Sequence, residues 1–148
     1  MNTKQLNILL ADDDIDDCMF FGTALKQIAT ETHLTTVNDG EQLMTYLSNN
    51  MDNLPDVLFL DINMPRKSGL ECLSEIKHNK NLKNLPVVMF STSNSWDTIN
   101  NLFKSGANVY IHKPTDFTHL KQVIHHALPM AIEKTTDSKN QLKYILNA

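Results

Sequence analysis

Five short apolar runs alternate with five segments of helical periodicity, and this alternation limits the possible folds more than any other feature of the sequence. The runs lie at residues 6–11, 32–37, 57–60, 86–90 and 109–111. The segments that follow them carry apolar residues at helical spacing, as in Phe117, Leu120, Val123 and Ile124. Strands that alternate with helices in this way predict an α/β protein, a doubly wound parallel sheet of five strands with helices on both faces.

The composition fits one globular domain that binds neither nucleic acid nor membrane. The 148 residues are 41% hydrophobic and 20% charged, which is ordinary for a globular protein. The net charge of −4 comes without any basic stripe, so we expect no direct nucleic-acid partner. No apolar run approaches the roughly 18 residues that span a bilayer, and the first residues do not resemble a signal peptide. We therefore expect a cytoplasmic protein.

The domain is expected to cover residues 1–130, with residues 131–148 as a C-terminal tail or a short added helix. This last segment is more polar than the rest of the chain and too short for a second domain. Leu142, Ile145 and Leu146 have helical spacing, which is the reason to consider a helix there.

Asp61 directly follows the third apolar run, whose unbroken pattern is typical of a strand buried on both faces. Pro65 and Gly69 then predict an irregular loop before the next helix. Because the carboxyl ends of the strands in an open α/β sheet face the ligand crevice, Asp61 is a candidate functional group. The alternative is that Asp61 only caps the following helix, but that role needs a helix within a residue or two, and Pro65 intervenes.

An acidic run follows the first strand. It holds five carboxylates in six positions: Asp12, Asp13, Asp14, Asp16 and Asp17. Some of these side chains suit the N-terminal end of the next helix. Five carboxylates are more than helix capping requires, and their negative charges repel one another. We therefore expect at least two of them to face a metal ion.

The fourth strand ends in a hydroxyl, Ser91, and the fifth is followed by Lys113. A site with few ligands other than carboxylates suits Mg²⁺, which prefers one or two protein carboxylates together with phosphate oxygens. A lysine and a hydroxyl opposite the carboxylates suit a phosphoryl group, and a carboxylate between them can act as a nucleophile toward phosphorus. These strand ends therefore predict a site where Asp61 receives a phosphoryl group, with Mg²⁺ and Lys113 neutralising its charge.

In these motifs the chain resembles the receiver domain of two-component response regulators, over about residues 5–128. The resemblance rests on Asp12-Asp13, on Asp-Ile-Asn-Met-Pro at 61–65 with Ser-Gly-Leu at 68–70, and on Ser91, Tyr110 and Lys113-Pro114. The acidic run looks most similar to small stand-alone receivers, including those associated with phytochrome-type kinases. The implied fold is flavodoxin-like, a (βα)5 arrangement with strand order 2-1-3-4-5.

The resemblance also implies a role for each matching residue. Asp61 would be the phosphoacceptor, assisted by Lys113 and Ser91. Mg²⁺ would be held by Asp12, Asp13, Asp61 and the backbone carbonyl of Asn63, and a share for Asp14 stays open. Ser91 and Tyr110 would form the conformational switch, and Asn63 and Ser93 would tune the lifetime of the aspartyl phosphate. Ser91 departs from the commoner Thr and lacks the methyl group that restricts the rotamer, so we expect a less sharply two-state switch.

The implied function is that of a single-domain response regulator in a phosphorelay. The phosphoryl group would come from the phosphohistidine of a sensor histidine kinase or a histidine phosphotransfer protein. The surface of the fourth helix, fifth strand and fifth helix would then change and bind a partner or relay the phosphoryl group, and a homodimer is a further option. We expect no enzymatic turnover beyond slow self-dephosphorylation. Trp96, at the start of the fourth helix, is either a core residue or an exposed anchor on that surface.

Three alternatives compete with this interpretation. A receiver-like scaffold that is never phosphorylated would not require the complete set of acids, hydroxyl and lysine. A phosphatase of the haloacid dehalogenase type usually needs a second Asp two residues after its nucleophile, where this chain has Asn63. A flavin-binding protein of the same topology would need a phosphate-binding loop after the first strand, where this chain has an acidic run.

Overall fold

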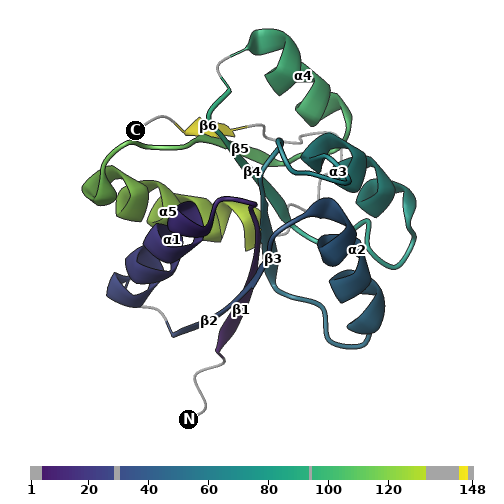
Figure 1. The fold of residues 1–148 in the computed structure, drawn as a ribbon, viewed down its shortest axis with the longest axis horizontal. Helices are drawn as coiled ribbons and strands as arrows, with labels where there is room; N and C mark the ends of the chain where they lie inside the picture. Colours follow the sequence, from purple (N-terminus) through teal and green to yellow (C-terminus); the bar gives the residue numbers. More distant parts are fainter. Residues whose placement is uncertain (1–4, 29–30, 94, 133–143, 147–148) are drawn as a thin grey trace.

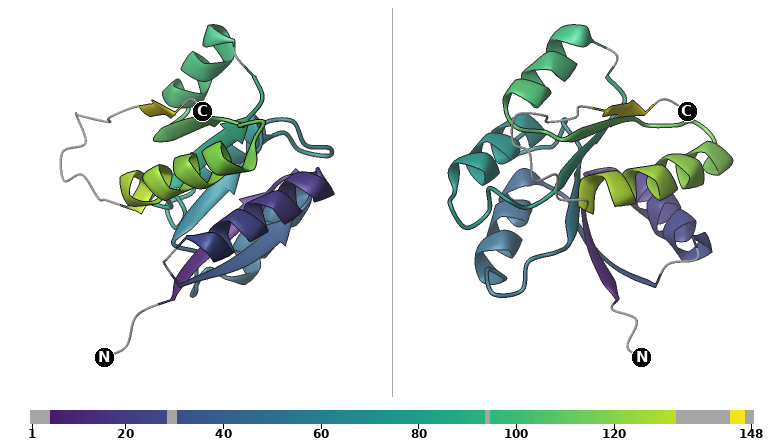
Figure 2. Two further views of the ribbon diagram at one scale, coloured as in Figure 1. Left: turned by 90° about the vertical axis from the view of Figure 1, so that its left-hand side faces the viewer. Right: turned by 180° about the vertical axis from the view of Figure 1, so that it is seen from behind.

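A parallel β-sheet forms the centre of the molecule, with helices on both of its faces (Figures 1 and 2). The computed structural model describes residues 5–28, 31–93, 95–132 and 144–146. The strands are β1 (Leu6–Ala11), β2 (Thr32–Val37), β3 (Val57–Leu60), β4 (Val87–Ser91), β5 (Val109–His112) and β6 (Tyr144–Leu146). The helices are α1 (Ile15–Gln27), α2 (Gly40–Asn49), α3 (Gly69–His78), α4 (Trp96–Lys104) and α5 (Phe117–Ile132). None of the described helices is long and apolar enough to cross a membrane.

The first five strands run in the order β2-β1-β3-β4-β5, which confirms the predicted topology. Their register aligns the carboxyl ends. Ala11, the last residue of β1, pairs with Leu60, the last residue of β3, and Ser91 at the end of β4 pairs with His112 at the end of β5. The residues that follow these positions therefore meet at one edge of the sheet.

The sixth strand differs from the sequence-based expectation. Tyr144–Leu146 pairs in parallel with β5, with Val109 opposite Tyr144, where a tail or an added helix was predicted. Helical spacing of a few residues cannot anticipate this strand, because its partner lies more than 30 residues earlier in the chain. Residues 133–143, including Leu142, lie outside the described residues, and the boundary at residue 130 stays a prediction. Pro129 lies inside α5, which continues to Ile132.

Each face of the sheet has its own hydrophobic cluster. On the face covered by α1 and α5, the rings of Phe21, Phe59 and Phe90 meet edge to face. On the opposite face, Leu43 of α2, Leu73 of α3 and Leu102 of α4 pack against the strands. Two close-packed layers of this kind hold the strand ends rigidly in place.

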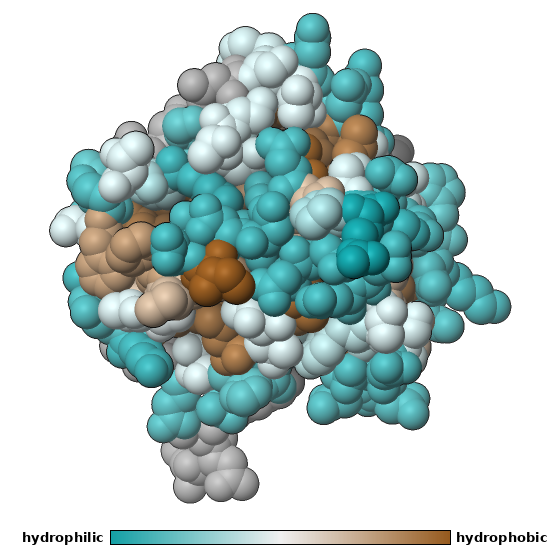
Figure 3. Space-filling view, viewed as in Figure 1, coloured by the Kyte–Doolittle hydropathy of each residue, from teal (hydrophilic) through white to brown (hydrophobic). Residues whose placement is uncertain are grey.

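Helix α1 exposes three large apolar side chains, Ile15, Met19 and Phe20, each at least 58% accessible. Figure 3 shows apolar atoms gathered on the side of α1 and α5 within a mainly hydrophilic surface. Trp96 at the start of α4 is 65% exposed. The sequence left open whether Trp96 is a core residue or an exposed one, and in the structure it is exposed.

Candidate functional site

Asp12, Asp13 and Asp61 meet at the carboxyl ends of β1 and β3. Each has a carboxylate oxygen within 4.8 Å of the corresponding oxygens of the other two. Asp12 is fully buried and Asp61 is 6% exposed, whereas Asp13 faces solvent. The sheet backbone fixes two of them, because the Asp12 amide donates to the Val37 carbonyl (3.0 Å) and the Asp61 amide to the Ala11 carbonyl (3.0 Å).

Asp14 is the N-cap of α1. Its carboxylate accepts a hydrogen bond from the Asp17 amide (3.1 Å), and its own amide donates to Oδ1 of Asp12 (3.0 Å). Asp14 thus caps the helix, whereas Asp12 and Asp13 belong to the carboxylate cluster, a division that the length of the acidic run suggested. Among the described residues, the cluster with metal-ligand geometry comprises Asp12, Asp13 and Asp61.

The loop between β3 and α3 is held close to Asp61 by Gly69. The Gly69 amide donates to the Ile62 carbonyl (2.7 Å). A Cβ atom at Gly69 would lie 2.1 Å from the Asp61 carbonyl oxygen, so only glycine permits this approach. A capping box between Ser68 and Glu71 then starts α3. The sequence indicated an irregular loop here, but this backbone contact becomes visible only in the folded structure.

Lys113, directly after β5, points its amine into the acidic cluster. Its Nζ lies 2.8 Å from Oδ2 of Asp12, 2.9 Å from Oδ2 of Asp17 and 3.7 Å from Oδ2 of Asp61. The Lys113 amide donates to the Ser91 carbonyl (2.8 Å), which ties the base of the side chain to β4. Sequence reasoning placed Lys113 opposite Asp61 but did not find its bond to Asp17. No local signal in the sequence indicates this bond, because Asp17 and Lys113 lie 96 positions apart.

Burial and charge shift the pKa values of both central groups. Burial raises the pKa of Asp61 to about 6; the nearby Lys113 amine opposes the increase and Asp12 adds to it. Burial alone would lower the pKa of Lys113, but its hydrogen bonds to Asp12 and Asp17 outweigh this and hold the pKa above its usual value. At neutral pH, Asp61 is therefore an anion and Lys113 a cation.

The two predicted switch residues lie next to this cluster. Ser91 is fully buried, and its Oγ accepts a hydrogen bond from the Ser93 amide (3.3 Å). The Tyr110 ring is fully buried as well, and its hydroxyl donates to the Ser93 carbonyl. Burial raises the pKa of the Tyr110 hydroxyl. Both predicted switch residues are therefore buried, and the switching itself stays a prediction.

The two predicted tuning residues lie in loops at the same edge of the sheet. Asn63 is exposed, two residues beyond Asp61. Ser93 is half-buried, and its hydroxyl accepts a hydrogen bond from the Ser95 amide (3.3 Å). Their effect on a phosphoryl group stays a prediction, as does a metal bond from the Asn63 carbonyl.

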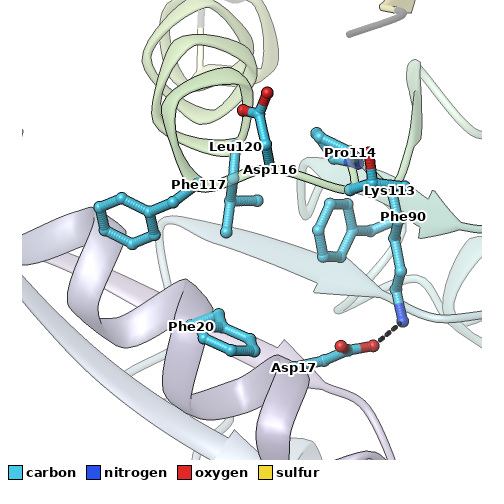
Figure 4. Close-up of a pocket in the computed structure, with 9 residues that line it drawn as sticks. Asp17, Phe20, Phe90, Lys113, Pro114, Asp116, Phe117 and Leu120 are labelled. Carbon is cyan, nitrogen blue, oxygen red and sulfur yellow. Dashed lines mark hydrogen bonds and ion pairs between the residues drawn. The ribbon is translucent and has the colours of Figure 1, made fainter.

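A small pocket opens beside Lys113, between α1 and α5 (Figure 4). Asp17 and Phe20 lie on one side of it, and Phe90, Phe117 and Leu120 on the other. Its volume is about 110 Å³, room for a few water molecules at about 30 Å³ each.

The donor set fits a hard divalent cation. Three carboxylates converge, one of them exposed to solvent, and Mg²⁺ prefers oxygen ligands together with retained water. Asp12, Asp13 and Asp61 would hold such an ion, which would relieve their mutual repulsion. The sequence-predicted acids are therefore brought together in the arrangement that the metal hypothesis requires.

Residues 8–125 match the family model described as response regulator receiver domain. Among curated proteins, response regulator Rcp1 of Synechocystis sp. is 31% identical over 121 residues, which cover 79% of this chain and 82% of Rcp1.

Two solved structures have the same fold. The phosphorylated cyanobacterial phytochrome response regulator RcpA superposes with a TM-score of 0.80 at 32% identity, covering 90% of this chain and 98% of RcpA. The Mn²⁺-bound form of Rcp1 superposes with a TM-score of 0.76 at 29% identity, covering 88% of this chain and 97% of Rcp1.

Proposed function

This chain belongs to the response regulator receiver family, and we propose that Asp61 is its phosphoacceptor, receiving a phosphoryl group from a phosphohistidine in a Mg²⁺-dependent reaction. One observation carries the proposal: the Asp61 carboxylate lies within 4.8 Å of two further carboxylates and 3.7 Å from the Lys113 amine. This arrangement can bind a cation and a phosphoryl group side by side.

The residues divide the chemistry as follows. Ionised Asp61 attacks phosphorus through a carboxylate oxygen, and the bond from phosphorus to the donor nitrogen breaks as the new bond to oxygen forms. Lys113 compensates the negative charge on the phosphoryl oxygens, and the Ser91 hydroxyl can donate a hydrogen bond to one of them. Asp12, Asp13 and Asp61 would hold a Mg²⁺ ion, which would supply further charge neutralisation. The product is an acyl phosphate on Asp61 with no released small molecule, so the protein acts as a signalling acceptor rather than an enzyme with turnover.

The surroundings of the site suit a protein donor. The acidic edge is open at Asp13, and Ile15, Met19 and Phe20 of α1 expose apolar surface next to it. Contiguous exposed apolar side chains often mark protein contact surfaces. A sensor histidine kinase or a histidine phosphotransfer protein would approach from this side. The expected cytoplasmic location stays a prediction.

Phosphorylation would change the surface formed by α4, β5 and α5. Tyr110 on β5 connects the Ser93 loop to the cluster under α4, where Ile99, Leu102 and Phe103 pack. A Ser91 hydroxyl drawn toward a phosphoryl group would disturb the Ser93 loop, since Ser91 Oγ accepts the Ser93 amide. Partner binding or a homodimer through this surface would follow from that rearrangement.

The test is phosphorylation with acetyl phosphate and Mg²⁺, read by intact mass and Phos-tag electrophoresis. Wild type should gain one phosphoryl group that is lost in base, and Asp61→Asn should gain none. Asp52→Asn makes the same chemical change at an exposed position before β3 and should behave as wild type. Omitting Mg²⁺ should abolish the gain.

Two results would favour other functions. A wild type that forms no adduct and binds no beryllofluoride would indicate a scaffold that is not phosphorylated. Sustained release of phosphate from small phosphate esters would indicate a phosphatase.

A further inference from the structure

Lys113 is bound more closely to Asp17 than to Asp61. The distance from its Nζ to Oδ2 of Asp17 is 2.9 Å, whereas the distance to Oδ2 of Asp61 is 3.7 Å, beyond hydrogen-bond range. Figure 4 shows the Asp17 side chain reaching from α1 to the Lys113 amine. The amine is thus held toward the first turn of α1, away from the carboxylate that it is proposed to assist.

The donors of the amine are limited. A lysine ammonium has three N–H bonds, and two of them are directed to Asp12 (2.8 Å) and Asp17 (2.9 Å). A phosphoryl group on Asp61 needs charge-assisted hydrogen bonds from the same amine. One donor is left for that group, so an amine that gives it two or more hydrogen bonds must release Asp12 or Asp17.

The two bonds differ in how easily they break. Asp12 is completely buried, whereas the Asp17 side chain is 37% exposed. An ion pair close to solvent is screened and contributes little, so the Asp17 bond is the weaker one. The backbone of Lys113 stays fixed by the hydrogen bond from its amide to the Ser91 carbonyl. Its amine lies 5.4 Å from the centre of the Phe90 ring. Only the end of the side chain needs to move.

We propose that Asp17 is a positioning residue that holds the Lys113 amine away from Asp61 until a phosphoryl group is present. This inference rests on the proposed function of Asp61. By competing for the amine, Asp17 lowers the affinity of the site for a phosphoryl group and raises the threshold for activation. Removing the Asp17 charge should make the amine more available to Asp61.

A merely structural role for Asp17 makes a different prediction. Acidic side chains in the first turn stabilise a helix through its positive N-terminal end, and Asp16 and Asp17 both lie in that turn of α1. Within the described residues, Asp16 is exposed and no ion pair joins it to Lys113. Asp16→Asn therefore removes the same charge from the same turn without freeing the lysine, which makes it the matched control.

The experiment is calorimetric titration with beryllofluoride, a phosphoryl mimic, at saturating Mg²⁺. Asp17→Asn and Asp17→Ala should bind it about two- to fivefold more tightly than wild type, the range expected for a partly exposed ion pair. Asp16→Asn should stay near wild type. In a Lys113→Ala background, Asp17→Asn should give no tightening.

NMR spectroscopy can detect the contact between Lys113 and Asp17 directly. The Lys113 ammonium should give a slowly exchanging ¹⁵N–¹H signal in wild type and in Asp16→Asn, and this signal should weaken in Asp17→Asn. Equal affinities for Asp17→Asn and Asp16→Asn, or weaker binding by Asp17→Asn, would overturn the inference. Wild type that binds no beryllofluoride would instead refute the proposed function, and the inference with it.

Discussion

Asp61 combines two properties that oppose each other. Its near-complete burial raises its pKa to about 6, yet a nucleophile or metal ligand must be ionised. The Lys113 amine stabilises the ionised form of Asp61 only in part, because it is shared with Asp12 and Asp17. The metal-free site therefore carries an unfavourable charge that a bound cation would relieve.

Without a divalent cation, Asp61→Asn should be more stable than wild type at pH 7.5 and equally stable near pH 4. The pKa of folded Asp61, about 6, lies above that of an unfolded Asp, about 3.9, so the folded state binds more protons between these values. Stability from this group therefore falls as the pH rises through that window, and the full loss of about 2–3 kcal/mol is present above pH 6. Urea unfolding in EDTA measures the difference. An Asn variant less stable than wild type at pH 7.5 would argue against the raised pKa.

Gly69→Ala should destabilise the protein by about 1–3 kcal/mol or more, because the new methyl group would meet the Asp61 carbonyl at 2.1 Å. The displaced backbone should also weaken Mg²⁺ binding. Gly22→Ala is the control, since its Cβ would meet the Leu34 side chain at an ordinary 3.5 Å and alanine favours the α1 helix. Urea unfolding and a Mg²⁺ titration check both effects. Equal stability of the two variants would show that the contact at Gly69 is unimportant.

At the scale of secondary-structure elements, β6 changes the expected response surface. It pairs with β5 along the edge that lies between α4 and α5 (Figure 1). An unpaired strand edge exposes backbone donors and acceptors that can pair with another chain. A partner that binds at α4, β5 and α5 would therefore meet β6 or replace it.

Deleting residues 133–148 should leave β5 as an edge strand. Those amides of β5 that face β6 should then exchange hydrogen for deuterium faster, because their partners are lost. Amides of β1, which lies between β2 and β3, should keep their protection and serve as the internal control. Unchanged exchange throughout β5 would indicate that β6 does not protect the edge in solution.

At the scale of the whole molecule, a metal ion bound at the acidic edge would couple its binding to folding. Asp12, Asp13 and Asp61 come from two strand ends that are far apart in the unfolded chain. These carboxylates therefore converge only in the folded state, and an ion that bound them would stabilise the fold by mass action.

Mg²⁺ at one hundred times its Kd should stabilise the protein by about 2.7 kcal/mol, which corresponds to a rise in Tm of roughly 5–10 °C. Asp13→Asn should lose most of this rise at little cost in metal-free stability, because Asp13 is exposed. Thermal unfolding with and without Mg²⁺ measures both. The same rise in wild type and Asp13→Asn would place the ion elsewhere.

Much of this protein can be predicted from the sequence, because the relevant signals are local. Apolar runs and helical stripes determine the five strands and five helices, and the residues after each strand identify Asp12, Asp13, Asp61 and Lys113 as neighbours. The strand-end rule works because parallel strands in register bring their carboxyl ends to one edge.

Other features depend on contacts between distant segments, and only the tertiary structure decided them. The bond between Asp17 and Lys113 joins residues 96 positions apart, and β6 depends on an open edge of β5. The need for glycine at position 69 comes from the close approach of α3 to the Asp61 backbone. Local patterns specify which elements form and which groups they carry. The distances between those groups, and so the competition of Asp17 with Asp61 for one lysine, follow from how the elements pack.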